Sequence, residues 1–336
     1  MATDSAQNLT EPTVYFPLGR GRFTVTPGFS PLTTSFGNGA MDARLFQIDR
    51  DFDQFRANKI AARAERSGKY VCFAPGFERL VPDVCRLMVI RLIAEYPDYF
   101  DLRREDGGAG TLLCRLTRET LHFNREMDLT GVESEVLVVP PYQNAFDALV
   151  SQVPEDIAVV ALPEGAPDKN VALHVTAPSH WEPEEKIGAS FLSTHARVPQ
   201  FERINAASAA LLEAVRTRPP VVRFNWGIEF SERLNLHPEP PLGADAAEWN
   251  RRVPRFADEY PVYLRIERQV LWGMEDARAL LFAIRVYVRP VNGLSPTERD
   301  TLRRTLLSIP EESRRYKGLP PETFAATVKY LAKVGD

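Results

Sequence analysis

The sequence predicts an α+β fold in which helices pack against an antiparallel sheet. Strand-like apolar runs come in pairs joined by short turns, at 156–162 with 171–177 and at 262–272 with 279–290. Such pairs are typical of β-hairpins. Residues 82–96 instead repeat their apolar side chains every three or four positions, as an amphipathic helix does. A chain that combines β-hairpins with amphipathic helices is expected to fold as a sheet covered by helices.

Composition limits the class of protein. The chain has 336 residues, 44% hydrophobic and 26% charged, which indicates a soluble globular protein of one large domain or two ordinary ones. A formal net charge of -4 argues against a nucleic-acid partner. No apolar run is long enough for a membrane helix and the N-terminus lacks a signal peptide, so we expect a cytoplasmic protein. Three widely spaced cysteines indicate neither a disulfide framework nor a CxxC metal site.

The first part of the chain divides into an arm and an extension. Residues 1–40 are rich in Gly, Pro, Thr and Ser with scattered aromatic side chains, which predicts an N-terminal arm without regular structure. Residues 41–142 predict an α/β extension. Its expected elements are helices at 46–67 and 82–96, a glycine-rich turn at 107–110, and strand-like segments at 111–117 and 134–141.

The rest of the chain predicts a core of two strands, helices and three strands over 143–292, followed by C-terminal helices over 293–336. Residues 231–260 are polar and proline-rich, which predicts a surface insert. In chain order the expected elements are a short helix at 144–153, strands at 156–162 and 171–177, a helix beginning at Pro183, a helix at 204–217, strands at 221–230, 262–272 and 279–290, and helices beginning at Ser295 and Pro321.

Three of the five histidines lie between His174 and His195. Histidine is the side chain most readily used for proton transfer near neutral pH or for binding a transition metal. His174 sits in an alternating apolar run, which indicates a strand residue, and His180 comes where that strand ends, which also fits a loop residue. His195 precedes Val198 and Pro199, where a helix must stop. It is therefore the best ligand candidate, with His180 second.

Each of the last three predicted strands carries an arginine that could share a face with other polar residues, because alternate residues point the same way. One interpretation is a solvated face with cross-strand pairs of about 0.2–1 kcal/mol each. The other is that Arg223, Arg265 and Arg285 converge on an anion such as a carboxylate or propionate. Glu267 would then orient them, bind an ammonium-type substrate or accept a proton.

Five segments carry a resemblance to a known family: QVPEDIAVV, HWEPEEKIGASFLSTHARVP, RFNWGIEF, LRIERQVL and FAIRVYV. Together they resemble the α subunit of haem-dependent oxidative N-demethylase, also called dimethylamine monooxygenase, over roughly residues 20–310. The block from W-x-P-x-E-K-I-G to H-x-x-V-P is the most specific part. The resemblance implies a haem-binding PAS-like core, a five-stranded antiparallel sheet with helices on one face, plus N-terminal elements.

The resemblance also implies a reaction. Haem b iron would activate O₂ to oxidise a methyl group of a small, dimethylamine-like secondary amine, giving a primary amine and formaldehyde. Electrons would come from NADPH through FMN and a 2Fe-2S cluster on partner reductase subunits, which fits the lack of a cysteine cluster or Rossmann fingerprint here. His195 matches the histidine of H-x-x-V-P and takes the axial-ligand role. The expected cofactor-binding residues are His195, Arg265, Arg285 and Trp226, and the expected catalytic residues are Glu267, Arg223, Asn225 and Gln269.

Two other functions fit the same fold, because fold alone does not determine function. One is a haem PAS-type sensor or binding protein for a gas or an amine, without turnover. The other is a relative that has lost haem and acts as an interaction scaffold. A sensor normally passes its signal to an output domain or coiled coil, and this sequence contains neither, which favours the enzyme.

Overall fold

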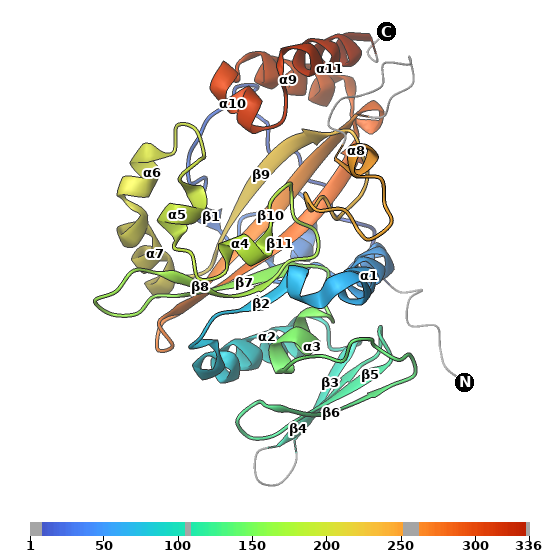
Figure 1. The fold of residues 1–336 in the computed structure, drawn as a ribbon, viewed down its shortest axis with the longest axis vertical. Helices are drawn as coiled ribbons and strands as arrows, with labels where there is room; N and C mark the ends of the chain where they lie inside the picture. Colours follow the sequence, from blue (N-terminus) through green and yellow to red (C-terminus); the bar gives the residue numbers. More distant parts are fainter. Residues whose placement is uncertain (1–8, 105–108, 251–261, 334–336) are drawn as a thin grey trace.

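The computed structural model describes residues 9–104, 109–250 and 262–333, and its strands form two antiparallel sheets (Figure 1). The larger sheet has seven strands in the order β1-β9-β10-β11-β7-β8-β2, and the smaller has the order β3-β4-β5-β6. The smaller sheet lies at one end of the molecule beside α2 and α3, and the C-terminal helices lie at the other end (Figure 1). The predicted α+β class with antiparallel pairing is confirmed.

The five strands predicted over 143–292 lie next to one another in the larger sheet. They are β7 (Asp156–Ala161), β8 (Lys169–His174), β9 (Val221–Glu229), β10 (Tyr263–Met274) and β11 (Ala279–Pro290). The expected number of five strands is nevertheless wrong. β1 (Ser30–Pro31) pairs with β9 and β2 (Val71–Phe73) pairs with β8, so both edges of the sheet are extended. Edge strands present unpaired N–H and C=O groups, and short segments of the N-terminal part satisfy some of them here.

Helices cover both faces of the larger sheet. On one face, hereafter the α7 face, Leu271 and Leu280 pack against Leu212 and Val215 of α7 (Ser208–Thr217). The opposite face, hereafter the α2 face, carries side chains such as Val159 that share a core with α2 (Val81–Glu95) and α3 (Ala145–Val150). The expectation of helices on one face is therefore wrong for the whole sheet. Each face carries apolar side chains, and these need a covering layer.

Both N-terminal helices form with shifted boundaries. α2 begins and ends one residue earlier than predicted, whereas α1 spans Phe52–Tyr70 in place of 46–67 and does not include Phe46. The backbone N–H groups of Leu45 and Phe46 donate instead to the Glu95 carboxylate at 2.9 and 3.3 Å, which holds this segment outside the helix. The smaller sheet comprises β3 (Phe100–Arg104), β4 (Gly110–Cys114), β5 (Glu119–Phe123) and β6 (Leu129–Ser134). The strand expected at 134–141 does not form, and most of the predicted glycine turn lies outside the described residues.

The helices of the second half follow the sequence signals, in shorter pieces. Ser295 caps α9 with Glu298 in a capping box, as S-x-x-E predicts. The predicted helix at 204–217 is divided into α6 and α7, and the end of the predicted surface insert lies outside the described residues. The remaining bounds are α4 (Pro183–Lys186), α5 (Phe191–His195), α6 (Glu202–Ala206), α8 (Ala246–Trp249), α9 (Pro296–Leu307), α10 (Glu311–Tyr316) and α11 (Pro321–Lys333), with 3-10 turns at Gly39–Ala43, Phe77–Arg79 and Val291–Gly293. No helix in the described ranges has the length and apolar character needed to cross a membrane.

Candidate functional site

Polar side chains follow β9 and β10 on part of the α7 face. The pairing register places Gln269 opposite Arg223, Glu267 opposite Asn225 and Arg265 opposite Gly227. The side chain of Asn225 is exposed, although it belongs to a well-paired strand. A Cβ atom added to Gly227 would meet no described atom within 4 Å. This face is therefore accessible at Asn225 and Gly227, whereas Gln269 and Arg265 beside them are buried.

Glu267 is the centre of a hydrogen-bond cluster on this open face. Ser179 Oγ donates to Glu267 Oε1 at 2.7 Å. Gln269 Nε2 and Asn225 Nδ2 donate to Glu267 Oε2 at 2.9 and 3.3 Å. The structure thus brings together Glu267, Asn225 and Gln269 as expected, and it adds Ser179. Three donors hold the carboxylate in one orientation.

Arg223 lies beside this cluster without a partner of its own. Its Nε atom is buried and has no hydrogen-bond acceptor among the described residues. Burial lowers the pKa of the Arg223 guanidinium, and the charge of Glu267 opposes that effect. A buried donor left without an acceptor is costly, and such an atom in a native protein calls for a specific explanation. An anionic ligand would supply the acceptor.

A second cation comes from the C-terminal helices. Lys317, directly after α10, donates from Nζ to the Trp226 carbonyl at 2.7 Å and lies 5.1 Å from the centre of the Trp226 ring. Burial lowers the pKa of Lys317 to about 8, although the negative charges of Glu267 and Glu229 act to raise it. Sequence reasoning missed this residue because it precedes a glycine and prolines at the end of a helical segment, which reads as a helix stop. Only the fold places it near β9.

The predicted convergence of three arginines is wrong for Arg285. Val286, not Arg285, lies opposite Glu267 in the register, so Arg285 points to the α2 face. There it pairs with Asp49 at 2.9 Å and stacks on the ring of Phe55 at 3.6 Å. Side-chain direction alternates along a strand, so a one-residue difference in register exchanges the faces.

Arg265 and Trp226 also differ from the expectation. Arg265 lies on the α7 face, but its three nitrogens donate to Ser179 Oγ and to the carbonyls of Arg233, Ala177 and Leu234 at 2.7–3.2 Å. Arg265 therefore joins two loops to the sheet. It also orients Ser179, which donates a hydrogen bond to Glu267. Trp226 alternates with Asn225 along β9 and therefore points to the α2 side, where its ring lies 6.4 Å from that of Phe23.

His195 has the geometry of a metal-binding imidazole. It is the last residue of α5, and its Nδ1 atom lies 2.8 Å from the Phe191 carbonyl. A proton on Nδ1 would make this hydrogen bond and leave Nε2 with a free lone pair. Metal-binding histidines usually donate their other N–H to a carbonyl in this manner. Burial and the nearby positive charge of Arg223 lower the pKa of His195, which favours the neutral form.

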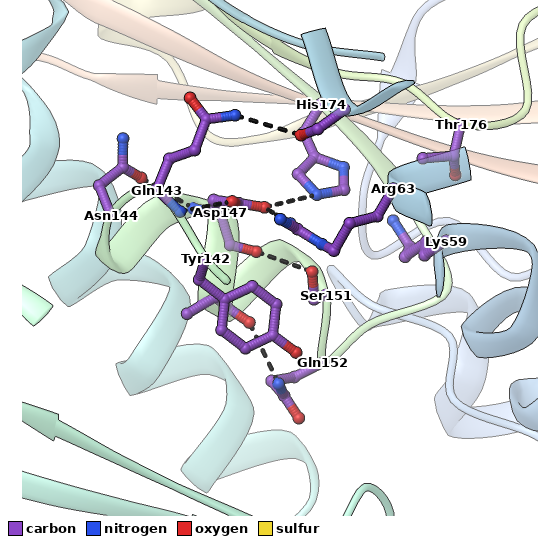
Figure 2. A network of polar contacts seen from close by, with 12 residues as sticks. Lys59, Arg63, Tyr142, Gln143, Asn144, Asp147, Ser151, Gln152, His174 and Thr176 are labelled. Carbon is purple, nitrogen blue, oxygen red and sulfur yellow. Dashed lines mark hydrogen bonds and ion pairs between the residues drawn. The ribbon is translucent and has the colours of Figure 1, made fainter. Parts of the chain in front are cut away.

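The other two histidines have partners. His180 Nε2 lies 2.9 Å from Glu229 Oε2, which links the loop after β8 to the end of β9. His174 is a strand residue, as predicted, and its Nε2 lies 3.2 Å from Asp147 in a buried network that also contains Arg63 (Figure 2). Among the described residues no group of three or more His, Cys, Asp or Glu side chains could hold a metal ion. His195 is thus the histidine best placed to bind an external group.

A separate cavity of about 330 Å³ lies between α1 and the segment 233–249. Its walls include Asn58, Glu65, Arg233 and Trp249, and it contains none of the predicted site residues. The side chain of Arg233 stacks on the Trp249 ring at 3.8 Å and partly occupies this region. The predicted site residues on the α7 face therefore lie apart from this cavity.

The comparison with known families agrees with the resemblance noted in the sequence. The family model described as haem-dependent oxidative N-demethylase, alpha subunit-like, matches residues 38–325. The match includes α1, every strand except β1, the His195 segment and α10. The chain therefore belongs to the haem-dependent oxidative N-demethylase, alpha subunit-like family.

Proposed function

We propose that this chain is the haem b-binding subunit of an enzyme that oxidatively demethylates a small secondary amine such as dimethylamine. The observation that carries the proposal is a set of groups on the α7 face. Arg223, whose buried Nε has no acceptor among the described residues, lies opposite Gln269, and Gln269 Nε2 donates to the carboxylate of Glu267. The charge of Arg223 also acts on the imidazole of His195, whose Nδ1 lies 2.8 Å from the Phe191 carbonyl.

The residues present fit a haem group. Haem needs one strong axial ligand, which the unshared Nε2 of His195 can provide. It also carries two propionate groups, and the unpaired Nε of Arg223 is a matching donor. The open surface over Asn225 and Gly227 leaves space beside the sheet. We propose that β7–β11 with α4–α7 form the PAS-like unit that binds the cofactor.

Haem, when bound, supplies the activation of O₂ for oxidation of an N-methyl group. The side chains of this chain bind and orient the substrate. We assign Glu267 to binding the ammonium form of the amine and to accepting its proton, because three donors fix the orientation of the carboxylate. Arg223 donates to negative charge in the site, either a propionate or charge that develops during the reaction. NADPH, FMN and a 2Fe-2S cluster are assigned to reductase subunits in the cytoplasm.

Absorption spectra of the haem-reconstituted protein test this function. The wild type should show a Soret band whose ligation changes in His195→Ala, and dimethylamine should shift the wild-type spectrum. With a reductant and O₂, formaldehyde should accumulate. A protein that takes up no haem contradicts the proposal. Haem uptake without formaldehyde from any small secondary amine would instead support a sensor or binding protein.

A further inference from the structure

Strand β8 contains a β-bulge next to the His195 segment. Val159 of β7 pairs with Ala172, whereas Val160 pairs with Asn170, so Val171 is an extra residue in β8. Val171 and Ala172 both belong to the core of the α2 face. Without the bulge, Asn170 would point to that face as well, because alternate residues share a face. The bulge turns Asn170 to the α7 face, and re-aiming a side chain is a common use of bulges near functional sites.

In this orientation Asn170 is bonded to the segment that leads to His195. Its backbone N–H donates to the Ala189 carbonyl at 2.9 Å, and its own carbonyl accepts from Gly188 N at 2.8 Å. Its side-chain Nδ2 donates to the Lys186 carbonyl at 3.2 Å and to Thr194 Oγ1 at 3.3 Å. One side chain thus contacts both the last residue of α4 and the residue directly before His195.

Helix α5 depends on such contacts for its position. It has only five residues and none of them is buried, and a helix this short has little stability of its own. Asp168 Oδ2 accepts from the backbone N–H of Phe191 at 2.5 Å and so holds the start of α5. The carbonyl of Phe191 in turn fixes the His195 ring through Nδ1. Asp168 lies in the turn before β8, and Asn170 lies in β8 itself. Their side chains therefore hold the two ends of α5.

We propose that Asn170 is a positioning residue for the His195 imidazole: its amide, aimed by the β8 bulge, fixes α5 so that Nε2 can ligate haem iron. This inference rests on the proposed function. It goes further by stating which residue sets the ligand geometry and how. The role needs the Nδ2 donor, because both side-chain bonds end on oxygen acceptors.

The test compares Asn170→Ala with Asn124→Ala, a matched control in which the lost amide bonds Asp128 at 2.9 Å in a turn of the smaller sheet. In the haem-free protein, amide hydrogen exchange across 187–195 should be about tenfold faster in Asn170→Ala, from the loss of two hydrogen bonds, and unchanged in the control. After reconstitution, Asn170→Ala should show mixed axial ligation by electron paramagnetic resonance, and the control a single species. Thr194→Val keeps the backbone hydrogen bonds of Asn170, so it should change hydrogen exchange and axial ligation in the same direction by a smaller amount. This variant provides the test if Asn170→Ala does not fold.

The outcomes separate this inference from the proposed function. Unchanged exchange and unchanged ligation in both Asn170→Ala and Thr194→Val, with ligation lost in His195→Ala, would overturn the positioning role and leave the haem function in place. A ligation signature that survives His195→Ala would remove His195 as the ligand and overturn the positioning role, whereas a protein that takes up no haem would overturn the proposed function. Faster exchange spread over the whole protein would show a general structural role and would also contradict the proposal.

Discussion

Substitution of Glu267 by glutamine tests the assignment of the amine-binding group. Glu267 Oε2 accepts from Asn225 and Gln269, while Oε1 accepts from the Ser179 hydroxyl. A glutamine can place its oxygen toward the two amide donors and its NH₂ toward Ser179 Oγ, because a hydroxyl also accepts. The change therefore removes the charge and keeps the hydrogen-bond geometry. Haem uptake should remain as in the wild type.

The expected loss in amine affinity follows from the charge. A hydrogen bond to a charged group contributes about 1.5–3 kcal/mol, which equals about 10- to 150-fold in affinity. Glu267 is only partly buried, so solvent screens part of its charge and we expect a loss of about tenfold. The assay is a dimethylamine titration of the reconstituted protein at pH 7, followed by absorption, with exposed Glu133→Gln as control. An affinity within about twofold of the wild type would refute the substrate role.

Three further predictions concern charges. Arg223→Met should raise the free energy of unfolding of the haem-free protein in urea by about 1–3 kcal/mol, because a buried unpaired donor is removed. The same variant should transfer its bound haem to a scavenger faster than the wild type. Unchanged haem retention would contradict the anion-binding role. Arg265→Met should instead destabilise the haem-free protein in the same assay, because four acceptors lose their donor. Burial lowers the pKa of Lys59 from 10.5 to about 8, so the folded state binds fewer protons than the unfolded state between these values. Stability should therefore rise with pH in that window, by about 2 kcal/mol from pH 7 to 9.5 for Lys59 and by a similar amount for Lys317, whose pKa is lowered in the same way. In urea titrations the total rise should be smaller by about 2 kcal/mol in Lys59→Met and unchanged in exposed Lys329→Met.

The sequence predicted the elements of the core better than their arrangement. Alternating apolar side chains located all five central strands, and Pro183, Ser295 and Pro321 marked helix starts correctly. The two added edge strands carry no signal, because β1 has two residues and β2 follows directly after α1. Their formation depends on pairing with distant strands. A pattern within each segment cannot supply that information.

The residues of the candidate site likewise divide into those that the sequence pattern groups and those that only the fold brings together. Glu267, Asn225 and Gln269 could be grouped from alternation in two strands, and the structure does bring them together. Ser179 and Lys317 reach the same place from a loop and a C-terminal helix, so only tertiary structure reveals them. The sequence also does not show the register between β10 and β11. In the structure this register places Arg285 on the α2 face.

The arginines of the larger sheet separate into those with acceptors and one without. Arg268 donates to two main-chain carbonyls, Arg285 to Asp49, and Arg265 to three carbonyls and a serine. Each of these acceptors comes from a segment distant in sequence, so each arginine joins parts of the fold. Arg223 has no such acceptor among the described residues, although it lies on a paired strand. An arginine that stabilises the fold needs an acceptor supplied by the protein, whereas one that binds a ligand must keep its donors free until the ligand arrives. Arg289 of β11 also has acceptors, the Tyr15 carbonyl and Glu298. By this criterion we propose that Arg223 binds a ligand, whereas the four arginines with acceptors belong to the framework.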